Sequence, residues 1–327
     1  MKNIARMLLG LIVLVGLPCL TASSNGRATL FPIVHPGQIL FYLVQSHSEK
    51  NTKTESNVVA PLTPDGSSRE AHGLLHIEIL DVRPQNARSE IHARSFFDVP
   101  NATKVLNSQP SQSTANAPHT NILEKSFVEF TIRANGSIDQ LKGFDDLPAE
   151  QQQVWREWAS KFAIAGMFPK DGLKLSEKWQ SQEDEKSPSP IAGLSWAKDW
   201  QYVRDEPCHA AQLSGEGETI DEDPQTELCA VILSNARLRQ KSNSKNSTPE
   251  DFRLHELKTM GTAKGENEVI VYISRKTGLV VRATEQAHQF MDVIVAKSDD
   301  SNRVHYNIEA KSSSEVRLVT QSPVAQP

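Results

Sequence analysis

Residues 269–284 read Val-Ile-Val-Tyr-Ile-Ser-Arg-Lys-Thr-Gly-Leu-Val-Val-Arg-Ala-Thr, and this stretch decides the fold. Two runs rich in β-branched residues, 269–274 and 279–284, are separated by the four residues from Arg275 to Gly278. Such runs are typical of β-strands, and a four-residue connection that ends in glycine is long enough for a hairpin. The stretch therefore predicts two neighbouring antiparallel strands.

Comparable runs surround this hairpin, at residues 252–260, 290–296, 304–308 and 316–319. The connections between them lack the dozen or more residues that a crossover to a parallel strand requires. From Asp251 onward the chain is therefore predicted to form an antiparallel meander.

Strand signals also occur in the N-terminal half, at residues 38–44, 72–82 and 127–133. They combine β-branched and aromatic residues with partial alternation of apolar and polar positions. An Asn-Gly dipeptide at 135–136, a strong signal for a hairpin turn, joins the third run to a short strand at 138–141. The N-terminal half should therefore contribute antiparallel strands of its own.

One helix is predicted between these strands. Its apolar residues are Val154, Trp155, Trp158, Phe162 and Ala165. They recur three and four positions apart, which places them on one face of the helix. Pro148 suits the first helical position, and the helix is expected to end near Gly166. The complete prediction is an α+β fold, mainly β: a large curved antiparallel sheet, a meander or half-barrel, with this helix packed on its concave face.

Three stretches are too polar to be predicted as strands, namely residues 46–68, 107–120 and 213–225. They contain too few apolar side chains to bury. We expect them to be long polar loops of one exported β-rich domain that spans residues 23–320. A disordered tail is expected at 321–327.

The first 22 residues have the composition of a secretory signal peptide. Lys2 and Arg6 precede an apolar run at 7–20, and small polar residues begin at Thr21. The run is about 14 residues long, whereas a membrane-spanning helix needs about 20. We therefore expect cleavage after Ala22, export to the periplasm or the extracellular space, and no membrane span in the mature chain.

Two alternatives to cleavage stay open: an uncleaved anchor, and a lipid attached to Cys19.

Cys208 and Cys229 are the other cysteines, and two cysteines in an oxidising compartment tend to pair. Strand-like runs at 200–204 and 230–233 flank them, so a disulfide would join two antiparallel neighbours. In the chain-entropy model a loop of this length stabilises the fold by about 3 kcal/mol. A redox or metal role is the alternative, but the sequence has no Cys-x-x-Cys motif.

The net charge and the sequence motifs give no support for several functions. A net charge of −5 over 327 residues gives no electrostatic support for nucleic acid or an anionic membrane as a partner. The sequence has no Gly-x-Ser-x-Gly, no phosphate-binding loop of the Walker type and no dinucleotide Gly-x-Gly-x-x-Gly. We therefore predict no catalytic residues and no cofactor.

The histidines and acids do not form a recognisable metal motif. His72, His76 and Glu78 could share a strand face, but a solvated sheet face explains them as well as a metal site does. The acidic segment 216–223 lacks the register of a calcium loop. No metal site is predicted.

The five tryptophans fall within one short stretch, at positions 155, 158, 179, 196 and 200. Core packing is one explanation for this clustering. The other is an apolar ligand pocket between helix and sheet, lined by Trp155, Trp158 and Phe162.

Four motifs stand out along the chain: Leu147-Pro148 at a helix start, then 167–170, 173–179 and 271–281. Together they resemble a group of exported, β-rich bacterial proteins of unknown function. The likeness covers about residues 126–319, and Ser176 stands where the pattern has glycine. The meander also resembles the half-barrel sheets of periplasmic lipoprotein carriers, which implies a fold and no functional residues.

The leading hypothesis is an exported, non-enzymatic protein of the cell envelope or periplasm that binds an apolar molecule between helix and sheet. A second is a structural or interaction module that contacts an envelope protein through polar loops or exposed sheet edges. A third is an enzyme whose catalytic residues are dispersed in the sequence.

Overall fold

The computed structural model describes residues 26–56, 65–85, 88–98, 127–164, 168–169, 171–185, 189–208, 227–241, 247–299 and 302–319. Four predicted segments lie outside these residues: the signal peptide at 1–22, the polar loops at 107–120 and 213–225, and the tail at 321–327.

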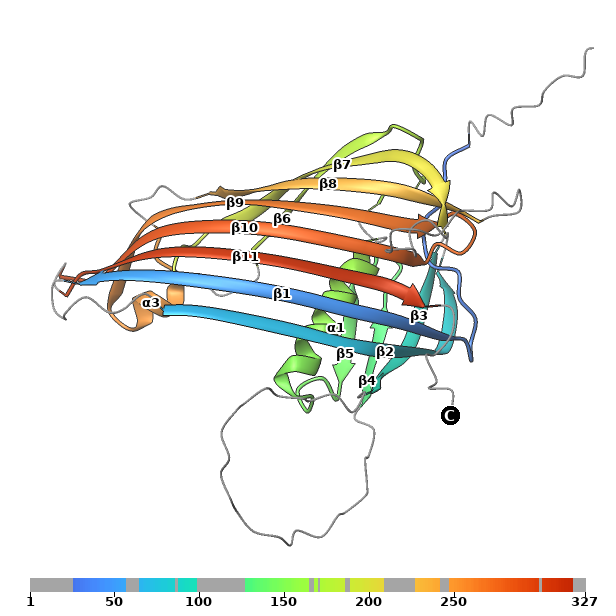
Figure 1. The fold of residues 1–327 in the computed structure, drawn as a ribbon, viewed down its shortest axis with the longest axis horizontal. Coiled ribbons are helices and arrows are strands. Elements are labelled where there is room, and N and C mark those ends of the chain that lie inside the picture. The colour runs from blue at the N-terminus through green and yellow to red at the C-terminus, as the bar shows by residue number, and fades with distance from the viewer. Residues whose placement is uncertain are drawn as a thin grey trace, which may run out of the picture.

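The described residues form eleven strands and two helices (Figure 1). The strands are β1 Ile39–Ser56, β2 Asp65–Gln85, β3 Arg88–Asp98, β4 Phe127–Ile132, β5 Ile138–Lys142, β6 Lys178–Asp184, β7 Leu194–Pro207, β8 Leu228–Gln240, β9 Leu257–Ser274, β10 Val280–Lys297 and β11 Val304–Val319. The helices are α1 Ala149–Phe162 and α3 Glu250–Leu254. Neither of them is both long enough and apolar enough to span a bilayer.

All the strands belong to one antiparallel sheet with the order β5-β4-β3-β2-β1-β11-β10-β9-β8-β7-β6. The sheet is not closed, because β5 and β6 lie at its two ends. The strands β1 to β5 and β6 to β11 each follow one another as a meander, and the two meanders meet where β1 pairs with β11. The prediction of a mainly β fold with an antiparallel sheet is confirmed.

The strands are longer than the sequence pattern predicts. The runs at 269–274, 279–284 and 304–308 are parts of β9, β10 and β11, which continue through polar residues with an unbroken register. Backbone hydrogen bonds hold these polar segments, and such bonds do not depend on apolar side chains. The run predicted at 252–260 begins instead within α3.

The prediction of a polar loop at 46–68 is wrong at both of its ends. Residues 46–56 belong to β1 and residues 65–68 to β2, while 57–64 lie outside the described residues. These polar segments pair with each other, from Ser46↔Ala71 to Thr52↔Asp65, and β1 pairs with β11 on its other side. A polar strand with a neighbour on each side satisfies its backbone as well as an apolar strand does.

Helix α1 packs on one face of the sheet, against β1, β2, β10 and β11, and lies behind the sheet in Figure 1. Val154, Trp155, Trp158 and Phe162 are buried, as predicted. Pro148 is the residue before the helix, one position earlier than predicted, and the α-helix ends at Phe162. The predicted Ala165 and Gly166 lie outside the described residues. The helix therefore covers the apolar part of this face with the stripe that the spacing predicted.

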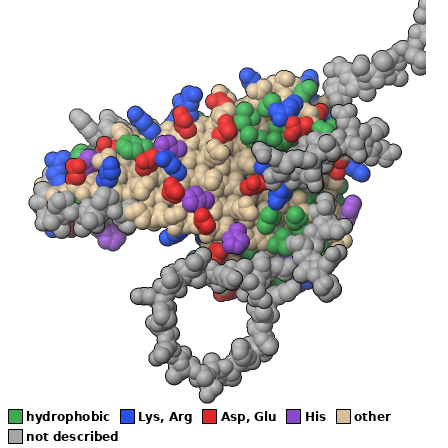
Figure 2. Space-filling view, in the orientation of Figure 1, with side chains coloured by type: hydrophobic (Ala, Val, Ile, Leu, Met, Phe, Trp, Pro, Cys, Tyr) green, Lys and Arg blue, Asp and Glu red, His purple; other side chains and the backbone are tan. Residues whose placement is uncertain are grey.

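Figure 2 shows the opposite face of the sheet. Hydrophobic side chains gather toward one end of it, and charged and histidine side chains are scattered over a surface that is otherwise backbone and uncharged polar groups. The long polar halves of the central strands explain this division. The main packed core lies toward one end of the sheet, and a smaller apolar cluster of Ile191, Leu194, Leu238, Ala263 and Val293 lies toward the other end of β8, β9 and β10.

The predicted disulfide is present. Cys208, directly after β7, is bonded to Cys229 in β8, with the two Cα atoms 4.9 Å apart. Both side chains are buried, beside Val281 and Tyr272. The bond joins two strands that are also neighbours in the sheet.

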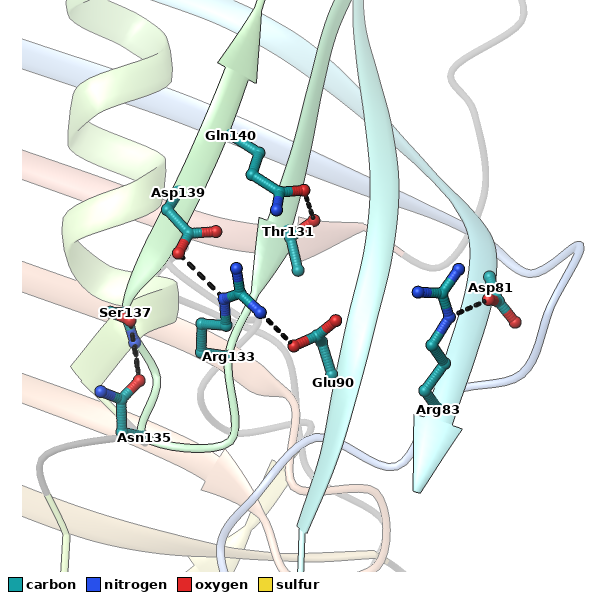
Figure 3. Close-up of polar contacts among 9 residues, drawn as sticks. All are labelled: Asp81, Arg83, Glu90, Thr131, Arg133, Asn135, Ser137, Asp139 and Gln140. Carbon is teal, nitrogen blue, oxygen red and sulfur yellow. Dashed lines mark hydrogen bonds and ion pairs between the residues drawn. The ribbon is translucent and has the colours of Figure 1, made fainter. Parts of the chain in front are cut away.

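The predicted Asn-Gly hairpin joins β4 to β5 (Figure 3). The Oδ1 atom of Asn135 accepts hydrogen bonds from the backbone N–H of Ser137, at 3.0 Å, and from its hydroxyl, at 2.7 Å. Arg133 donates to Asp139 at 2.9 Å and to Glu90 at 2.6 Å. These contacts tie the edge strand β5 to β4 and β3.

Candidate ligand-binding site

A cavity of about 730 Å³ lies between α1 and the polar part of the sheet. From the sheet it is lined by Ser46, His47, Ser48, Ser68, Arg69, Glu70, Ala71, Glu285, Ser312, Ser313 and Ser314, and from α1 by Ala149, Glu150, Gln152, Gln153, Arg156 and Glu157. We call this space the helix–sheet cavity. Almost all its side chains carry a hydroxyl, an amide or a charge.

The cavity follows from a change of side chain along β1 and β11. Alternate residues of β1 face α1: Leu40, Tyr42 and Val44 are buried, and Ser46 and Ser48 come next on the same face. In β11, Ser314 and Ser312 pair with these two serines. Because serine is much smaller than the tyrosine and leucine before it, the helix passes over an empty space lined with hydroxyl groups.

A buried ion pair stands at one side of the helix–sheet cavity. Lys161 of α1 has only 2% of its side chain exposed and pairs with Glu285 of β10, which also accepts a hydrogen bond from Asn267 of β9. The Oε2 atom of Glu157 lies 3.7 Å from the same amine. A buried amine is costly unless it is paired, so this contact fixes the position of α1 on the sheet.

Two effects act on the Glu285 carboxyl. Burial raises its pKa, while the positive charge of Lys161 and the hydrogen bonds from Lys161 and Asn267 lower it. The net result is a pKa below the ordinary value, so Glu285 is ionised at neutral pH. The cavity therefore has a fixed negative charge in its wall, balanced by the lysine behind it.

Other polar groups also stand in the wall. Arg69 forms no ion pair with the described part of the chain, and the Oγ atom of Ser314 is buried with no hydrogen-bond partner among the described residues. Arg156 is held in place, because it lies 5.0 Å over the ring of Phe144 and donates to Gln152 at 3.1 Å. The wall thus offers the guanidinium group of Arg69 to a ligand, whereas the hydroxyl of Ser314 is buried.

The three residues predicted to line an apolar pocket lie in the core beneath α1. Trp155 donates to the hydroxyl of Ser95 at 3.0 Å, and the ring of Trp158 lies 5.0 Å from Phe162 and 5.4 Å from Phe130. None of the three lines the helix–sheet cavity. An apolar pocket at these residues stays a prediction.

Two polar atoms in this core have no hydrogen-bond partner among the described residues: the hydroxyl of Tyr42 and the indole N–H of Trp158. Their rings lie 6.1 Å apart, and both side chains are fully buried. Burial raises the pKa of the Tyr42 hydroxyl, so it stays protonated. The core beneath the helix therefore includes polar groups as well as apolar surface.

The histidine group that the sequence suggested for metal binding is dispersed. Glu78 forms an ion pair with Arg94 at 2.8 Å, and the ring of His76 packs edge-on against Phe41 at 4.4 Å. His72 is exposed. In the ranges that the structure describes, no group of three or more histidine, cysteine or acidic side chains is placed to hold a metal ion.

A broader hollow of about 910 Å³ is lined by residues of β1, β7, β8, β9, β10 and β11. Its histidines already have carboxylate partners, since His47 lies 3.1 Å from Glu49 and His288 lies 3.0 Å from Glu309. The helix–sheet cavity differs from it, because a helix covers it. We therefore take the helix–sheet cavity as the candidate site.

The sequence pattern did not identify this site. Ser46, Ser48 and Ser68 fall in the segment predicted as a loop, and Ser312 and Ser314 lie between two predicted strands. The predicted apolar stripe of α1 does not include Lys161. A signal for the lysine exists, because positions 154, 158 and 161 follow the helical period and Lys161 therefore lies on the buried stripe.

No protein-family model matches the sequence, and no curated protein matches it. Among solved structures, one described as lipid–protein interactions in lipovitellin has a TM-score of 0.33 and 13% identity, and covers 90% of this chain and 26% of that chain. A candidate lipoprotein from Parabacteroides distasonis has a TM-score of 0.24 and 12% identity, and covers 90% of this chain and 98% of that chain. This chain thus spans about a quarter of the lipovitellin chain. Because both TM-scores are below 0.5, we base no functional conclusion on either likeness.

Proposed function

We propose that this chain is an exported, non-enzymatic binding protein that holds a polar ligand in the helix–sheet cavity. The observation that carries the proposal is a covered cavity of about 730 Å³ lined almost entirely by polar and charged side chains. Small-molecule sites usually measure about 300–1,000 Å³. We further propose that the sheet curves around α1, so that the helix lies on its concave face.

The chemistry of the wall decides the kind of ligand. An apolar molecule would remove water from Arg69 and Gln153 without replacing their hydrogen bonds, and each such loss is unfavourable. A ligand with hydroxyl, amide or anionic groups can accept and donate in their place. We therefore expect a polar ligand, in place of the apolar one that the tryptophans suggested.

The test is a matched pair of leucine variants. Ser46 lines the cavity, and Gln45 is exposed on the opposite face of the same strand. Ser46→Leu fills space in the cavity and adds an apolar group, whereas Gln45→Leu makes a comparable change outside it. The measurement is calorimetric titration of the purified mature chain with a panel of oligosaccharides, phosphorylated headgroups and short peptides.

We expect saturable binding of a polar compound that Ser46→Leu weakens by about tenfold or more, while Gln45→Leu leaves it within about twofold. Equal affinity in both variants would show that the ligand lies elsewhere. Binding of apolar probes alone would favour the pocket at Trp155, Trp158 and Phe162 instead.

A further inference from the structure

Strand β2 has a neighbour on only one side for nine residues. Its pairs with β1 run from Ile39↔Glu78 to Thr52↔Asp65, but its pairs with β3 stop at Leu74↔Asp98. From Asp65 to Gly73, no strand of the described chain lies on the other side. We call this nine-residue segment the free edge of β2.

The geometry fixes which backbone groups point outward. Ile79 donates its N–H to Gln38 at 2.9 Å, so the backbone of Ile79 faces β1. The register between β1 and β2 has no shift down to Asp65, and backbone direction alternates along an antiparallel strand. The outward N–H and C=O groups of the free edge therefore belong to Gly66, Ser68, Glu70 and His72.

Another uncovered strand end in this sheet is blocked by side chains. Strand β9 extends beyond its last pair with β8, at Glu266. There, Thr248 accepts a hydrogen bond from the backbone N–H of Thr259 at 2.9 Å, and Gln240 donates to the carbonyl of Gly261 at 3.4 Å. The free edge of β2 has no such contacts in the described residues, so it remains open to pairing.

The free edge also forms one wall of the helix–sheet cavity. Ser68, Arg69, Glu70 and Ala71 line that cavity. A strand added beside them would place every second side chain on the face that carries α1, next to Gln153 and the serine hydroxyls.

We propose that the ligand of the helix–sheet cavity is an extended peptide segment of another polypeptide, which adds a strand to β2 along the free edge. This inference rests on the proposed function and names its ligand class. Backbone hydrogen bonds to Gly66, Ser68, Glu70 and His72 provide the affinity, and the polar cavity selects side chains with hydroxyl or amide groups.

A second copy of this chain fits the free edge less well. Full overlap of two antiparallel copies, related by a two-fold axis, places the middle residue of the segment opposite itself, and that residue is Arg69. A shift of the axis by one residue places either Glu70 or Ser68 opposite itself. Like charges directly opposite each other are destabilising, and the Ser68 register, which avoids them, pairs only residues 65–71 of the free edge. A different polypeptide can pair with all nine residues, so we take it as the occupant.

The test uses a proline that removes one outward N–H. Proline is tolerated on edge strands where the N–H faces away from the ladder, so Ser68→Pro should keep the pairing with β1. Ser68→Ala is the matched control, because it removes the same hydroxyl and keeps the N–H. The probe is a synthetic peptide selected from a random nine-residue library on the immobilised mature chain, and its affinity is measured by calorimetry.

We expect the peptide to bind wild type and Ser68→Ala within about twofold and Ser68→Pro about tenfold more weakly or worse. Peptide should also slow amide hydrogen exchange at Ser68 and Glu70 in the wild type. Hydrogen exchange in the wild type tests the inference even if Ser68→Pro does not fold.

Unchanged affinity in folded Ser68→Pro, no protection at these amides, or failure to select a peptide would each overturn the inference. The proposed function has its own test, since a polar compound that is not a peptide would still distinguish Ser46→Leu from Gln45→Leu.

Discussion

Lys161 of α1 and Glu285 of β10 form an ion pair at the boundary between the packed core and the helix–sheet cavity. The two residues are 124 positions apart in the sequence, so the pair joins the helix to the C-terminal meander. It places a charged contact where the sheet face changes from apolar to polar. The position of α1, and therefore the shape of the cavity, depends on it.

Removal of one partner should destabilise the protein. Lys161→Met leaves the Glu285 carboxylate in a mostly buried place with only Asn267 as a close partner, so the free energy of unfolding should fall by about 2–4 kcal/mol. The double variant Lys161→Met/Glu285→Leu should recover most of this loss. Urea unfolding of the two single variants and the double variant measures the coupling. A loss below about 0.5 kcal/mol for Lys161→Met would mean that the pair does not hold the helix.

The same carboxyl should make stability depend on pH. In the folded protein the pKa of Glu285 lies below its ordinary value of 4.5, so the unfolded chain takes up a proton at a higher pH than the folded chain does. The stabilisation is therefore present above pH 4.5 and is lost as the pH falls through the lower folded value. Urea unfolding between neutral and acidic pH should show a smaller decrease for Glu285→Gln than for wild type. Parallel curves for the two proteins would contradict this account of Glu285.

The disulfide should stabilise the pairing of β7 with β8. It closes a loop with a sequence separation of 21, for which the chain-entropy model gives about 3 kcal/mol. Thermal unfolding with and without a reductant measures the effect, and the double variant Cys208→Ala/Cys229→Ala, which should not respond to reductant, is the control. An unchanged midpoint on reduction of the wild type would show that the bond adds nothing to stability.

Trp158 should matter for stability more than for ligand binding. Its side chain is 0% exposed, so Trp158→Ala should cost about 3–5 kcal/mol, whereas Leu254→Ala, at a residue that is 74% exposed, should change little. Chemical denaturation gives both values. For Trp158→Phe, affinity for a polar ligand should stay within about twofold of wild type, because Trp158 does not line the cavity. Loss of binding in Trp158→Phe would indicate that the ligand binds in the predicted apolar pocket.

The sequence predicts the parts of the fold that depend on apolar side chains. The hairpin at 269–284, the buried stripe of α1 and the disulfide between Cys208 and Cys229 are all confirmed. Each has a local signal: β-branched runs around a turn, a helical period of apolar residues, or paired cysteines between strand-like segments. These signals identify the apolar end of the sheet.

The polar segments of β1, β2 and β11 have no such local signal. Residues 46–56 are rich in serine, lysine and glutamate, and they are a strand because β2 and β11 pair with them from both sides. Only the register, which is set by contacts far apart in the sequence, shows that Ser46 faces α1 and lies opposite Ser314. The helix–sheet cavity consists of such residues, so it could be found only once the strands were paired.

The most direct test of the central claim is to follow backbone amide NMR signals while the first polar compound found to bind is titrated into the mature chain. A ligand in the helix–sheet cavity should cause the largest shifts at Ser46, Ser312 and Ser314, in proportion to its occupancy. Largest shifts at Arg237 and His288, which line the other hollow and not the helix–sheet cavity, would contradict the account.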